Sequence, residues 1–440
     1  MSRATSARYL LRPAQRVQGE LSVPGDKSIS HRALMLGGIA EGRSDIDGFL
    51  ASEDCLATLS ALRALGVRIE RPSETRVQVY GAGSEGLRAA ALALDMGNAG
   101  TAIRLFMGLL AGQRFDSALV GDASLMRRPM ERVAQPLRAM GARIQTHEGR
   151  PPVQIRGGSA LHAIDYTMPM ASAQVKSALL LAALFAQGRS SVTEPAPTRD
   201  HTERMLGSFG VALVRDAARV SLEGGARLQA CHIEVPGDFS SAAFFIVAGC
   251  LAASAGLTLR GVGVNPTRTG LLELLRLMGA DIRVEPRAGA AEGAEPIADI
   301  HVRAAALQGI RVPEHLVPLA IDEFPVFFIA AAAARGQTLV TGAAELRVKE
   351  SDRLAVMAEG LRSLGVECEL LADGLRIQGG TLRGGRIDSH GDHRIAMAFA
   401  IASLIAHESI EIEDVANVAT SFPGFPALAR SVGLALQEQP

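Results

Sequence analysis

Seven cationic side chains stand where the sequence predicts the starts of helices. They are Lys27, Arg32, Arg104, Arg128, Lys349, Arg353 and Arg394. A cation near a helix N-terminus opposes the helix dipole, so its presence makes sense if an anion binds there to the free backbone N–H groups and the cation together. Seven cations indicate ligands with several negative charges, such as phosphates and carboxylates, and arginine suits bidentate binding of either group.

Three further ionisable residues, Asp322, Glu350 and His393, lie among these cations in the sequence. Cations favour the carboxylate form of a neighbouring acid, so Asp322 can accept a proton from a substrate hydroxyl if the geometry allows it. The sequence has no Walker A motif, no GxGxxG motif and no metal-ligand pattern. We therefore expect chemistry that is linked to phosphate and independent of nucleotide and metal.

The cations belong to a six-fold internal repeat. In each repeat an Ala- and Leu-rich run ends at a marker residue, and a strand follows; the markers are Gly42, Gly112, Gly188, Gly256, Gly336 and Glu408. A second helix ends at another glycine in the left-handed position after a helix, and these glycines are Gly66, Gly141, Gly210, Gly279, Gly365 and Gly433. Lys27 stands 15 residues before its marker, and Asn98, Gln174 and Asp322 each stand 14 before theirs.

This repeat predicts an α/β (α+β) fold of βαβαββ units. The first helix of each unit is apolar nearly all round, as in 178–186, and must be buried, whereas the second carries Arg and Glu and should face solvent. Six units in 440 residues fit two domains of three units. An open array would need polar capping repeats, and the sequence shows none.

Simpler explanations compete with ligand binding at several helix starts. Capping alone explains "GDFSS" (237–241), and Asp26 is expected to cap the first helix. Lys349 and Arg353 are four residues apart and are predicted to share one helical face, but Glu350 and Arg353 could also form an ordinary surface pair. "PTRDHTERM" (197–205) and "NPTRTG" (265–270) each place an arginine beside a threonine, and His31 has no assigned role.

Composition excludes several classes of protein. The net charge of −1 argues against a nucleic-acid-binding protein, and no apolar stretch reaches the length of a membrane span. The four cysteines form no metal pattern and are expected to be reduced thiols of a cytoplasmic protein. The first 15 residues lack the apolar region of a secretory signal. No coiled-coil heptads appear, and a monomer is expected.

Eight stretches from one end of the chain to the other resemble the motifs of the 5-enolpyruvylshikimate-3-phosphate synthase family. They are "VPGDKSISHRA", "GNAGTAIRL", "GDASLMRRPM", "MASAQVKSALLLA", "TRDHTE", "IDEFP", "LRVKESDRL" and "GDHRIAMAFA". The resemblance runs from about residue 17 to residue 436, in the family's order, and the spelling is closest to the bacterial branch with "PGDKSISHR" and "PMASAQVKS".

The resemblance implies the enolpyruvyl transferase fold. One domain of three repeats would hold residues 1–23 plus 237–440, and the other 24–236, with the active site in the cleft between them. It also implies the reaction of shikimate 3-phosphate with phosphoenolpyruvate to give 5-enolpyruvylshikimate 3-phosphate and phosphate, without a cofactor. Glyphosate is the inhibitor that the resemblance implies.

The resemblance also implies the roles of individual residues. Shikimate 3-phosphate would be held by Lys27, Ser28, Arg32, Ser172, Gln174, Arg199, Asp322 and Lys349. Phosphoenolpyruvate would be held by Lys27, Gly100, Arg128, Gln174, Arg353 and Arg394. Lys27, Asp322 and Glu350 would be catalytic, with Asp322 as the base for the 5-hydroxyl and Glu350 as the proton relay at the methylene carbon.

Three positions depart from the commoner family pattern, namely Thr420 where many members have Lys, Leu105 where many have Pro, and Glu345 where many have Asn. Two rival interpretations remain open. The sister transferase that acts on UDP-N-acetylglucosamine carries a reactive Cys in a loop near an Arg-Pro pair, and "SLMRRPM" contains none. A non-catalytic repeat scaffold, or a nucleic-acid-binding relative built from similar units, is the other rival.

Overall fold

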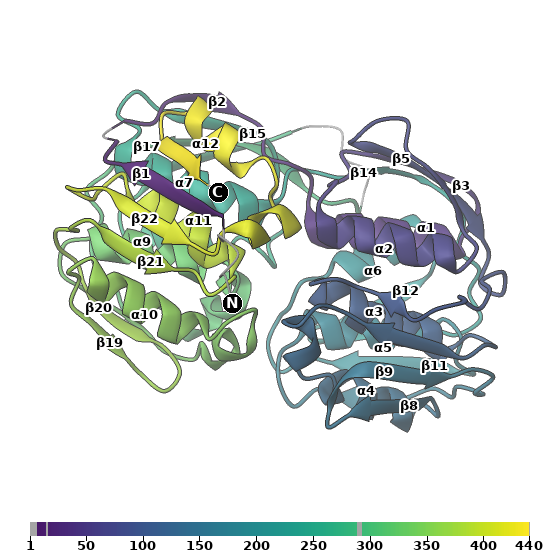
Figure 1. The fold of residues 1–440 in the computed structure, drawn as a ribbon. Helices are drawn as coiled ribbons and strands as arrows, with labels where there is room; N and C mark the ends of the chain where they lie inside the picture. The colour runs from purple at the N-terminus through teal and green to yellow at the C-terminus, as the bar shows by residue number, and fades with distance from the viewer. Residues whose placement is uncertain (1–6, 15, 288–292, 440) are drawn as a thin grey trace, which may run out of the picture. The chain divides into compact units, whose positions relative to one another are not determined.

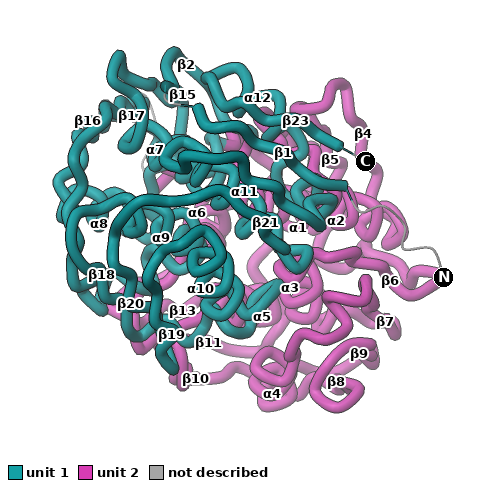
Figure 2. Tube along the Cα trace, turned by 60° about the vertical axis from the view of Figure 1, so that its left-hand side comes forward, with its two compact units in different colours: residues 1–24, 236–290, 296–440 teal, residues 25–235, 291–295 magenta. Residues whose placement is uncertain are grey.

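The computed structural model describes residues 7–14, 16–287 and 293–439. Within these residues the chain forms twelve α-helices and six small β-sheets (Figure 1). It divides into two compact units, coloured separately in Figure 2. Unit 1 comprises Met1–Pro24, Pro236–Ala290 and Pro296–Pro440, and unit 2 comprises Gly25–Val235 and Ala291–Glu295.

Unit 2 contains three four-stranded sheets of the same design. Their strand orders are β14-β3-β5-β4, β6-β7-β9-β8 and β10-β11-β13-β12. In each sheet the first two strands are parallel and the remaining pairs are antiparallel. The strands are β3 Glu41–Asp47, β4 Arg68–Glu70, β5 Arg76–Ala82, β6 Leu94–Asp95, β7 Ser117–Val120, β8 Arg143–His147, β9 Arg150–Arg156, β10 Asp165–Thr167, β11 Arg189–Thr193, β12 Leu213–Asp216, β13 Arg219–Glu223 and β14 His232–Glu234.

Unit 1 repeats this design with one shorter sheet. The orders are β16-β17-β15-β2, β21-β22-β1-β23 and β18-β20-β19. Beside β18, the place of a fourth strand is taken by two isolated parallel bridges, Gln308 to Arg335 and Arg311 to Leu339. The strands are β1 Arg8–Arg12, β2 Gly19–Leu21, β15 Leu257–Gly263, β16 Asp281–Pro286, β17 Ile297–Arg303, β18 Gln337–Val340, β19 Cys368–Leu370, β20 Leu375–Gln378, β21 Gly385–Asp388, β22 Ile410–Glu413 and β23 Ala435–Gln439.

The predicted α/β fold of βαβαββ repeats is confirmed, although some repeats are completed by distant segments. Two repeats are contiguous in the chain, in the orders β6-α3-β7-α4-β8-β9 and β10-α5-β11-α6-β12-β13. By contrast, β1 pairs between β22 and β23, and β14 pairs in parallel with β3. Strands pair through backbone hydrogen bonds, which need only two adjacent backbones in extended conformation. A segment that is distant in the sequence can therefore supply the missing strand of a repeat.

Each repeat contributes one helix to the buried interior of its unit. These helices are α1 Lys27–Ile39, α3 Gly100–Ala111, α5 Ala173–Ala183, α7 Phe239–Ala252, α9 Phe324–Ala333 and α11 His393–Ala402. Four of them start behind a side chain that accepts a backbone N–H, as Asp26 does from Ile29 at 2.9 Å. The predicted cap at Asp26 is therefore confirmed, and an apolar helix can begin in the interior without losing the hydrogen bonds of its first turn.

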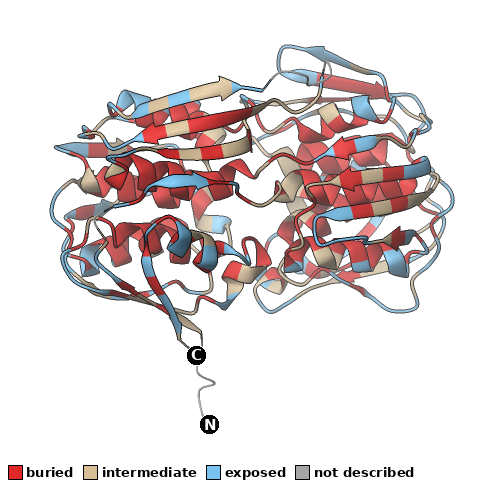
Figure 3. Ribbon diagram, turned by 90° about the horizontal axis from the view of Figure 1, so that it is seen from above, coloured by how far each residue is buried: buried red, intermediate tan, exposed pale blue. Residues whose placement is uncertain are grey.

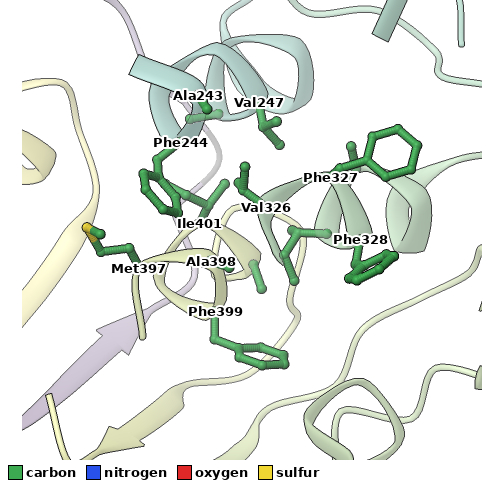
Figure 4. Packing of buried hydrophobic residues seen from close by; sticks show 14 of the residues in the cluster. Ala243, Phe244, Val247, Val326, Phe327, Phe328, Met397, Ala398, Phe399 and Ile401 are labelled. Carbon is green, nitrogen blue, oxygen red and sulfur yellow. The ribbon is translucent and has the colours of Figure 1, made fainter. Parts of the chain in front are cut away.

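In unit 1 the three buried helices pack directly on one another. Figure 4 shows Phe244 of α7, Val326 of α9 and Ile401 of α11 meeting in the core. Nearly every residue of these helices is buried, which explains why their sequences lack a polar face. Figure 3 shows where buried and exposed residues lie. Buried residues are concentrated in the helices, and exposed residues alternate with buried ones along the strands.

In unit 2 the closest helix pair is α3 with α5. A Cβ atom on Gly108 of α3 would lie 2.1 Å from the carbonyl oxygen of Ala178 on α5, so only glycine permits this approach. The short separation brings the first turns of the two helices close enough for their side chains to bond, as the candidate site shows.

The second helices cover the units with one buried and one exposed face. They are α2 Glu53–Ala64, α4 Glu131–Ala139, α6 His201–Ser208, α8 Gly270–Leu277, α10 Arg353–Ser363 and α12 Phe425–Ser431. On α2, for example, Cys55, Leu59 and Leu62 are buried. These helices were expected to face solvent. Each does so on one side only, and its other side packs against the interior of its unit.

The glycines after the second helices have the predicted left-handed conformation. All six have a positive φ, between +84° at Gly210 and +117° at Gly433. The first series is less uniform, because Gly112 ends α3 with φ −88°. No helix among the described residues is both long and apolar enough to cross a membrane.

We predict that Gly210→Ala lowers the free energy of unfolding by about 1–2 kcal/mol, because φ is +84° and a side chain is disfavoured there. The nearest atom to a Cβ would lie 3.9 Å away, so crowding contributes nothing. Gly207→Ala is the matched control, since a Cβ there meets nothing within 4 Å and the residue is helical. Urea denaturation of both variants checks this, and equal stability of the two would contradict it.

Candidate active site

Lys27 begins α1 in unit 2 and is held by a carboxylate from the next helix. Its Nζ lies 2.9 Å from Oδ2 of Asp54, in the first turn of α2. The side chains of Lys27 and Asp54 are 16% and 8% exposed, so the ion pair is mostly buried. The ion pair fixes where the charge of Lys27 can act.

Arg32 lies one turn further along α1 and is buried. Its guanidinium donates to Thr202 Oγ1 on α6 at 2.7 Å, to Ser177 Oγ on α5 at 2.8 Å and to the carbonyl of Ser28 at 2.9 Å. Burial lowers the pKa of Arg32 to about 10, which still leaves the group protonated at neutral pH. Arg32 thus joins three helices and places its positive charge beside the partly exposed Ser28.

The first turns of α3 and α5 are joined by a second arginine. Arg104 Nη1 donates to Gln174 Oε1 at 2.8 Å, and Gln174 Nε2 donates to Thr101 Oγ1 at 3.1 Å. Ser172 caps α5 by accepting the N–H of Val175. The amide of Gln174 is therefore oriented from both of its ends, and the backbone N–H groups of this turn lie beside a buried cation.

Gly100, the first residue of α3, lies against the guanidinium of Arg128. A Cβ on Gly100 would be 2.8 Å from Arg128 Nη1 and 3.2 Å from Arg104 Nη1. Arg128 follows a short 3₁₀ helix, Leu125–Arg127, and donates to Asn98 Oδ1 at 2.5 Å and to Ser124 Oγ at 3.3 Å. Two arginines thus converge on a helix start that carries no side chain, which is a favourable arrangement for a phosphate or carboxylate.

In unit 1, Asp322 lies between cations just before α9. Its Oδ1 is 3.4 Å from Lys349 Nζ and 3.5 Å from Arg353 Nη1. Its carbonyl oxygen accepts from Arg394 Nη1 at 3.1 Å. Three of the predicted cations therefore meet at one acid, which remains partly exposed.

Arg353 is the buried centre of this group. It donates to Asp392 Oδ2 at 2.8 Å and to Glu350 Oε2 at 2.6 Å, and its side chain is 1% exposed. Burial alone would lower the pKa of Arg353, but the carboxylates of Asp392, Glu350 and Asp322 raise it above its ordinary value. The pair with Glu350 is thus no ordinary surface ion pair.

The predicted shared helical face of Lys349 and Arg353 is wrong. Lys349 follows the 3₁₀ helix Ala344–Val348 with non-helical backbone, whereas Arg353 begins α10 behind the cap Asp352. The cap starts a new helix because its side chain accepts the N–H of Ala355, at 3.1 Å. The two cations still reach the same acid, but from two segments that meet at Asp322.

The described residues contain no group of three or more His, Cys, Asp or Glu side chains arranged to hold a metal ion. Arg199 is partly exposed in the loop before α6. Together with the contacts above, each unit gathers cations, hydroxyls and amides at the starts of its helices. Such an arrangement can bind phosphate and carboxylate groups and move a proton through Asp322 or Glu350.

Comparison with known proteins decides the family. The sequence model of EPSP synthase (3-phosphoshikimate 1-carboxyvinyltransferase) matches residues 11–428. The chain belongs to the EPSP synthase family. A 3-phosphoshikimate 1-carboxyvinyltransferase from Methylococcus capsulatus is 59% identical over 427 residues, covering 97% of both chains. One from Alkalilimnicola ehrlichii is 60% identical over 430 residues, covering 97% of this chain and 96% of that protein.

Solved structures of EPSP synthases have the same fold. One from Acinetobacter baumannii superposes with a TM-score of 0.88 at 53% identity, covering 99% of this chain and 100% of that one. A second structure from the same organism has a TM-score of 0.86 at 52% identity. The family resemblance inferred from the motifs is therefore confirmed.

Sequence reasoning missed a buried ion cluster in this EPSP synthase family member. Lys176 on α5 has a side chain that is 1% exposed, and its Nζ lies 2.6 Å from Glu194 Oε1 and 2.7 Å from Glu203 Oε1. Glu194 also accepts the hydroxyl of Thr198, the residue before Arg199. The cluster thus anchors the loop that carries Arg199, and the only sequence signal for it was a lysine inside an apolar run.

The contacts of His31, Thr420 and His393 indicate no chemical role for these residues. His31 is fully buried beside Thr58 Oγ1, 2.8 Å from its Nδ1, and burial lowers the pKa of His31 well below its ordinary range. Thr420 is buried and donates its hydroxyl to the carbonyl of Asn417 at 2.7 Å. His393 is buried at the first position of α11.

We predict that Lys176→Met lowers the free energy of unfolding by about 3–5 kcal/mol at pH 8, because it leaves two carboxylates buried without their cation. Burial already raises the pKa of Glu194, so protonation at lower pH removes the buried charge and the loss should shrink towards pH 5. Urea denaturation at the two pH values measures this.

Arg156→Met is the matched control, because the Arg156–Asp116 pair is 2.6 Å long but more than half exposed on both sides. We expect it to leave the unfolding midpoint nearly unchanged. A Lys176→Met loss no larger than that of the control would contradict the structural account of the cluster.

Proposed function

We propose that the protein transfers the enolpyruvyl group of phosphoenolpyruvate to the 5-hydroxyl of shikimate 3-phosphate and releases phosphate. This is the reaction of 3-phosphoshikimate 1-carboxyvinyltransferase, in the shikimate pathway that leads to chorismate and the aromatic amino acids. Membership of the EPSP synthase family supports the proposal. The observation that carries it is that the partly exposed Asp322 carboxylate lies 3.4 Å from Lys349 Nζ and 3.5 Å from Arg353 Nη1.

The unit 2 residues are proposed to hold shikimate 3-phosphate. Lys27, Ser28, Ser172, Gln174 and Arg199 are all partly exposed, so a solute can reach them. The buried Arg32 supplies positive charge beside Ser28. A phosphate ester would be recognised there by cations, hydroxyls and helix-start N–H groups together. Asp322 and Lys349 of unit 1 are proposed to act on the same substrate.

Phosphoenolpyruvate is proposed to bind Lys27, Gly100, Arg128 and Gln174 together with Arg353 and Arg394. The absence of a side chain at Gly100 leaves Arg128 Nη1 and Arg104 Nη1 facing the same helix start. Phosphoenolpyruvate carries a phosphate and a carboxylate, and arginines suit both groups. Glyphosate, an anion with a phosphonate and a carboxylate, is proposed to occupy the same groups as an inhibitor.

The chemistry needs one base and one proton relay. In the addition step, Asp322 takes the proton of the 5-hydroxyl, the oxygen bonds to C2 of phosphoenolpyruvate, and a proton is added to the methylene carbon. Glu350 is proposed to relay that proton with Lys27. In the elimination step, the C2–O bond to phosphate breaks and a proton leaves the methyl carbon, which restores the double bond. The fixed cations stabilise the negative charge on the intermediate and on the leaving phosphate.

Cys55 argues against the rival reaction with UDP-N-acetylglucosamine by a reactive cysteine. Its thiol is fully buried, and burial raises its pKa, so the reactive thiolate is disfavoured. The loop before Pro129 contains no cysteine. We further propose that the protein is a cytoplasmic monomer. Its four unpaired cysteines support the cytoplasmic location.

We predict that the protein releases phosphate from phosphoenolpyruvate with shikimate 3-phosphate and does not with UDP-N-acetylglucosamine. Asp322→Ala should lower turnover by about 10²–10⁴-fold, because the base is lost, while retaining binding of shikimate 3-phosphate. A phosphate-release assay and calorimetry measure the two quantities. Full activity of Asp322→Ala would contradict the assigned base, and no turnover by the wild type would contradict the proposed function.

We predict that glyphosate inhibits the enzyme competitively with phosphoenolpyruvate and that Gly100→Ala weakens this inhibition by tenfold or more. The added Cβ would lie 2.8 Å from Arg128 Nη1, so the arginine must move from the anion. A tenfold loss corresponds to about 1.4 kcal/mol. Gly207→Ala, whose Cβ meets nothing within 4 Å, is the control. Unchanged inhibition in Gly100→Ala, or no effect of millimolar glyphosate at low phosphoenolpyruvate, would contradict the prediction.

A further inference from the structure

Two polar motifs in unit 1 have no part in the proposed reaction. They are "GDFSS" (237–241), which leads into α7, and "NPTRTG" (265–270), whose last residue begins α8. In the structure both turn inward, and Ser240 and Arg268 are each 3% exposed. Capping accounts for Asp238, which accepts the N–H of Ser241, but it does not account for a buried arginine.

Arg268 and Ser240 are connected to Glu323. Arg268 Nη2 donates to Ser240 Oγ at 2.6 Å, and the Ser240 hydroxyl donates to Glu323 Oε1. Arg268 Nη2 also lies 3.7 Å from Asp238 Oδ1 and 3.9 Å from Glu323 Oε1. Because Glu323 is 2% exposed, its carboxylate depends on these protein groups in place of water.

The loop that carries Arg268 is itself held in shape. Asn265 Oδ1 accepts the N–H of Thr267 at 2.9 Å and its hydroxyl at 2.7 Å, and the Asn265 carbonyl accepts the N–H of Arg268 at 2.8 Å. At the following Gly270 a Cβ would lie 2.9 Å from the backbone of Leu319, so the start of α8 packs tightly against the segment that leads to Asp322.

The network affects the candidate site because Glu323 is adjacent to Asp322 in the chain. Glu323 is the N-cap residue of α9, yet its side chain does not cap the helix. It turns to Ser240 and Arg268, and it directly follows Asp322 in the chain. Anchoring Glu323 therefore fixes the peptide from which the Asp322 carboxylate extends towards Lys349 and Arg353.

We propose that Arg268, Ser240 and Glu323 form a positioning network for Asp322. The inference rests on the proposed function, because it assigns the network to the base of that reaction. None of the three is a catalytic residue, since each acts on Asp322 through the backbone of Glu323, the residue that follows it. The polar start of α7 binds no substrate group in the proposed function. Its Ser240 instead holds the start of α9 in place through Glu323.

The test uses the full-length protein and two mild substitutions, Glu323→Gln and Ser240→Ala. For Glu323→Gln we expect kcat to fall by about tenfold to hundredfold, because small displacements of a catalytic group are costly. KM for phosphoenolpyruvate and the Kd for shikimate 3-phosphate should change by less than about threefold, since the proposed contacts of both substrates remain. Ser240→Ala should lower kcat in the same direction but less. The matched control is Glu273→Gln, an exposed carboxylate on α8, which should leave kcat unchanged.

A second measurement separates positioning from a merely structural role. In an Asp322→Ala background, Glu323→Gln should cause no further loss of the residual rate, because the group that it positions is absent. A structural defect would lower both rates by the same factor and would lower the thermal midpoint. Circular dichroism of each variant monitors folding, and Ser240→Ala decides the matter if Glu323→Gln does not fold.

Three results would overturn the inference. They are a wild-type kcat in folded Glu323→Gln and Ser240→Ala, an equal loss in the Asp322→Ala background, and a loss that appears only in KM. In each of these the wild type still turns over both substrates, so the proposed function survives. Absence of turnover in the wild type would overturn the proposed function and, with it, the positioning role.

Discussion

The fold depends on one constraint, which is that a charge placed in the interior must find partners there. Arg32, Lys176, Arg268 and Arg353 are all almost fully buried, and each is bonded to hydroxyls, carbonyls or carboxylates from other helices. These bonds join the starts of the buried helices within each unit. The same bonds orient the partly exposed groups beside them. One set of side chains therefore stabilises the fold and, in the proposed function, also positions the groups that bind anions.

Features set by local chemistry could be predicted from the sequence. The left-handed glycines follow from the need to end a helix and start a strand, and the cap at Asp26 follows from its place before an apolar run. The six buried helices were found because an apolar surface on every side leaves a helix no place but the interior. Of the candidate site, the cations and Asp322 were selected from the sequence, because a positive charge at a helix start opposes the helix dipole and indicates a bound anion. Their roles in binding and catalysis stay predictions.

Features set by tertiary contact could not be predicted in this way. Lys349 and Arg353 are four residues apart, which is the spacing of neighbours on one helix face. In the structure Asp352 lies between them and caps a new helix that begins at Arg353. Spacing alone does not show whether such a residue continues a helix or starts a new one. The bond from Arg32 to Thr202 spans 170 positions of the chain. Likewise, a lone lysine at 176 gives no indication that Glu194 and Glu203 surround it. Such pairs become visible only when the fold has brought distant segments together.

The central claim is that the cations at the helix starts serve bound anions, and calorimetric titration with shikimate 3-phosphate tests it most directly. The titration is performed on the wild-type protein with and without glyphosate. We predict binding in both cases and an affinity for shikimate 3-phosphate that is about 5–150-fold higher with glyphosate, because each ligand stabilises the state that binds the other. No binding of shikimate 3-phosphate, or the same affinity with and without glyphosate, would contradict the account.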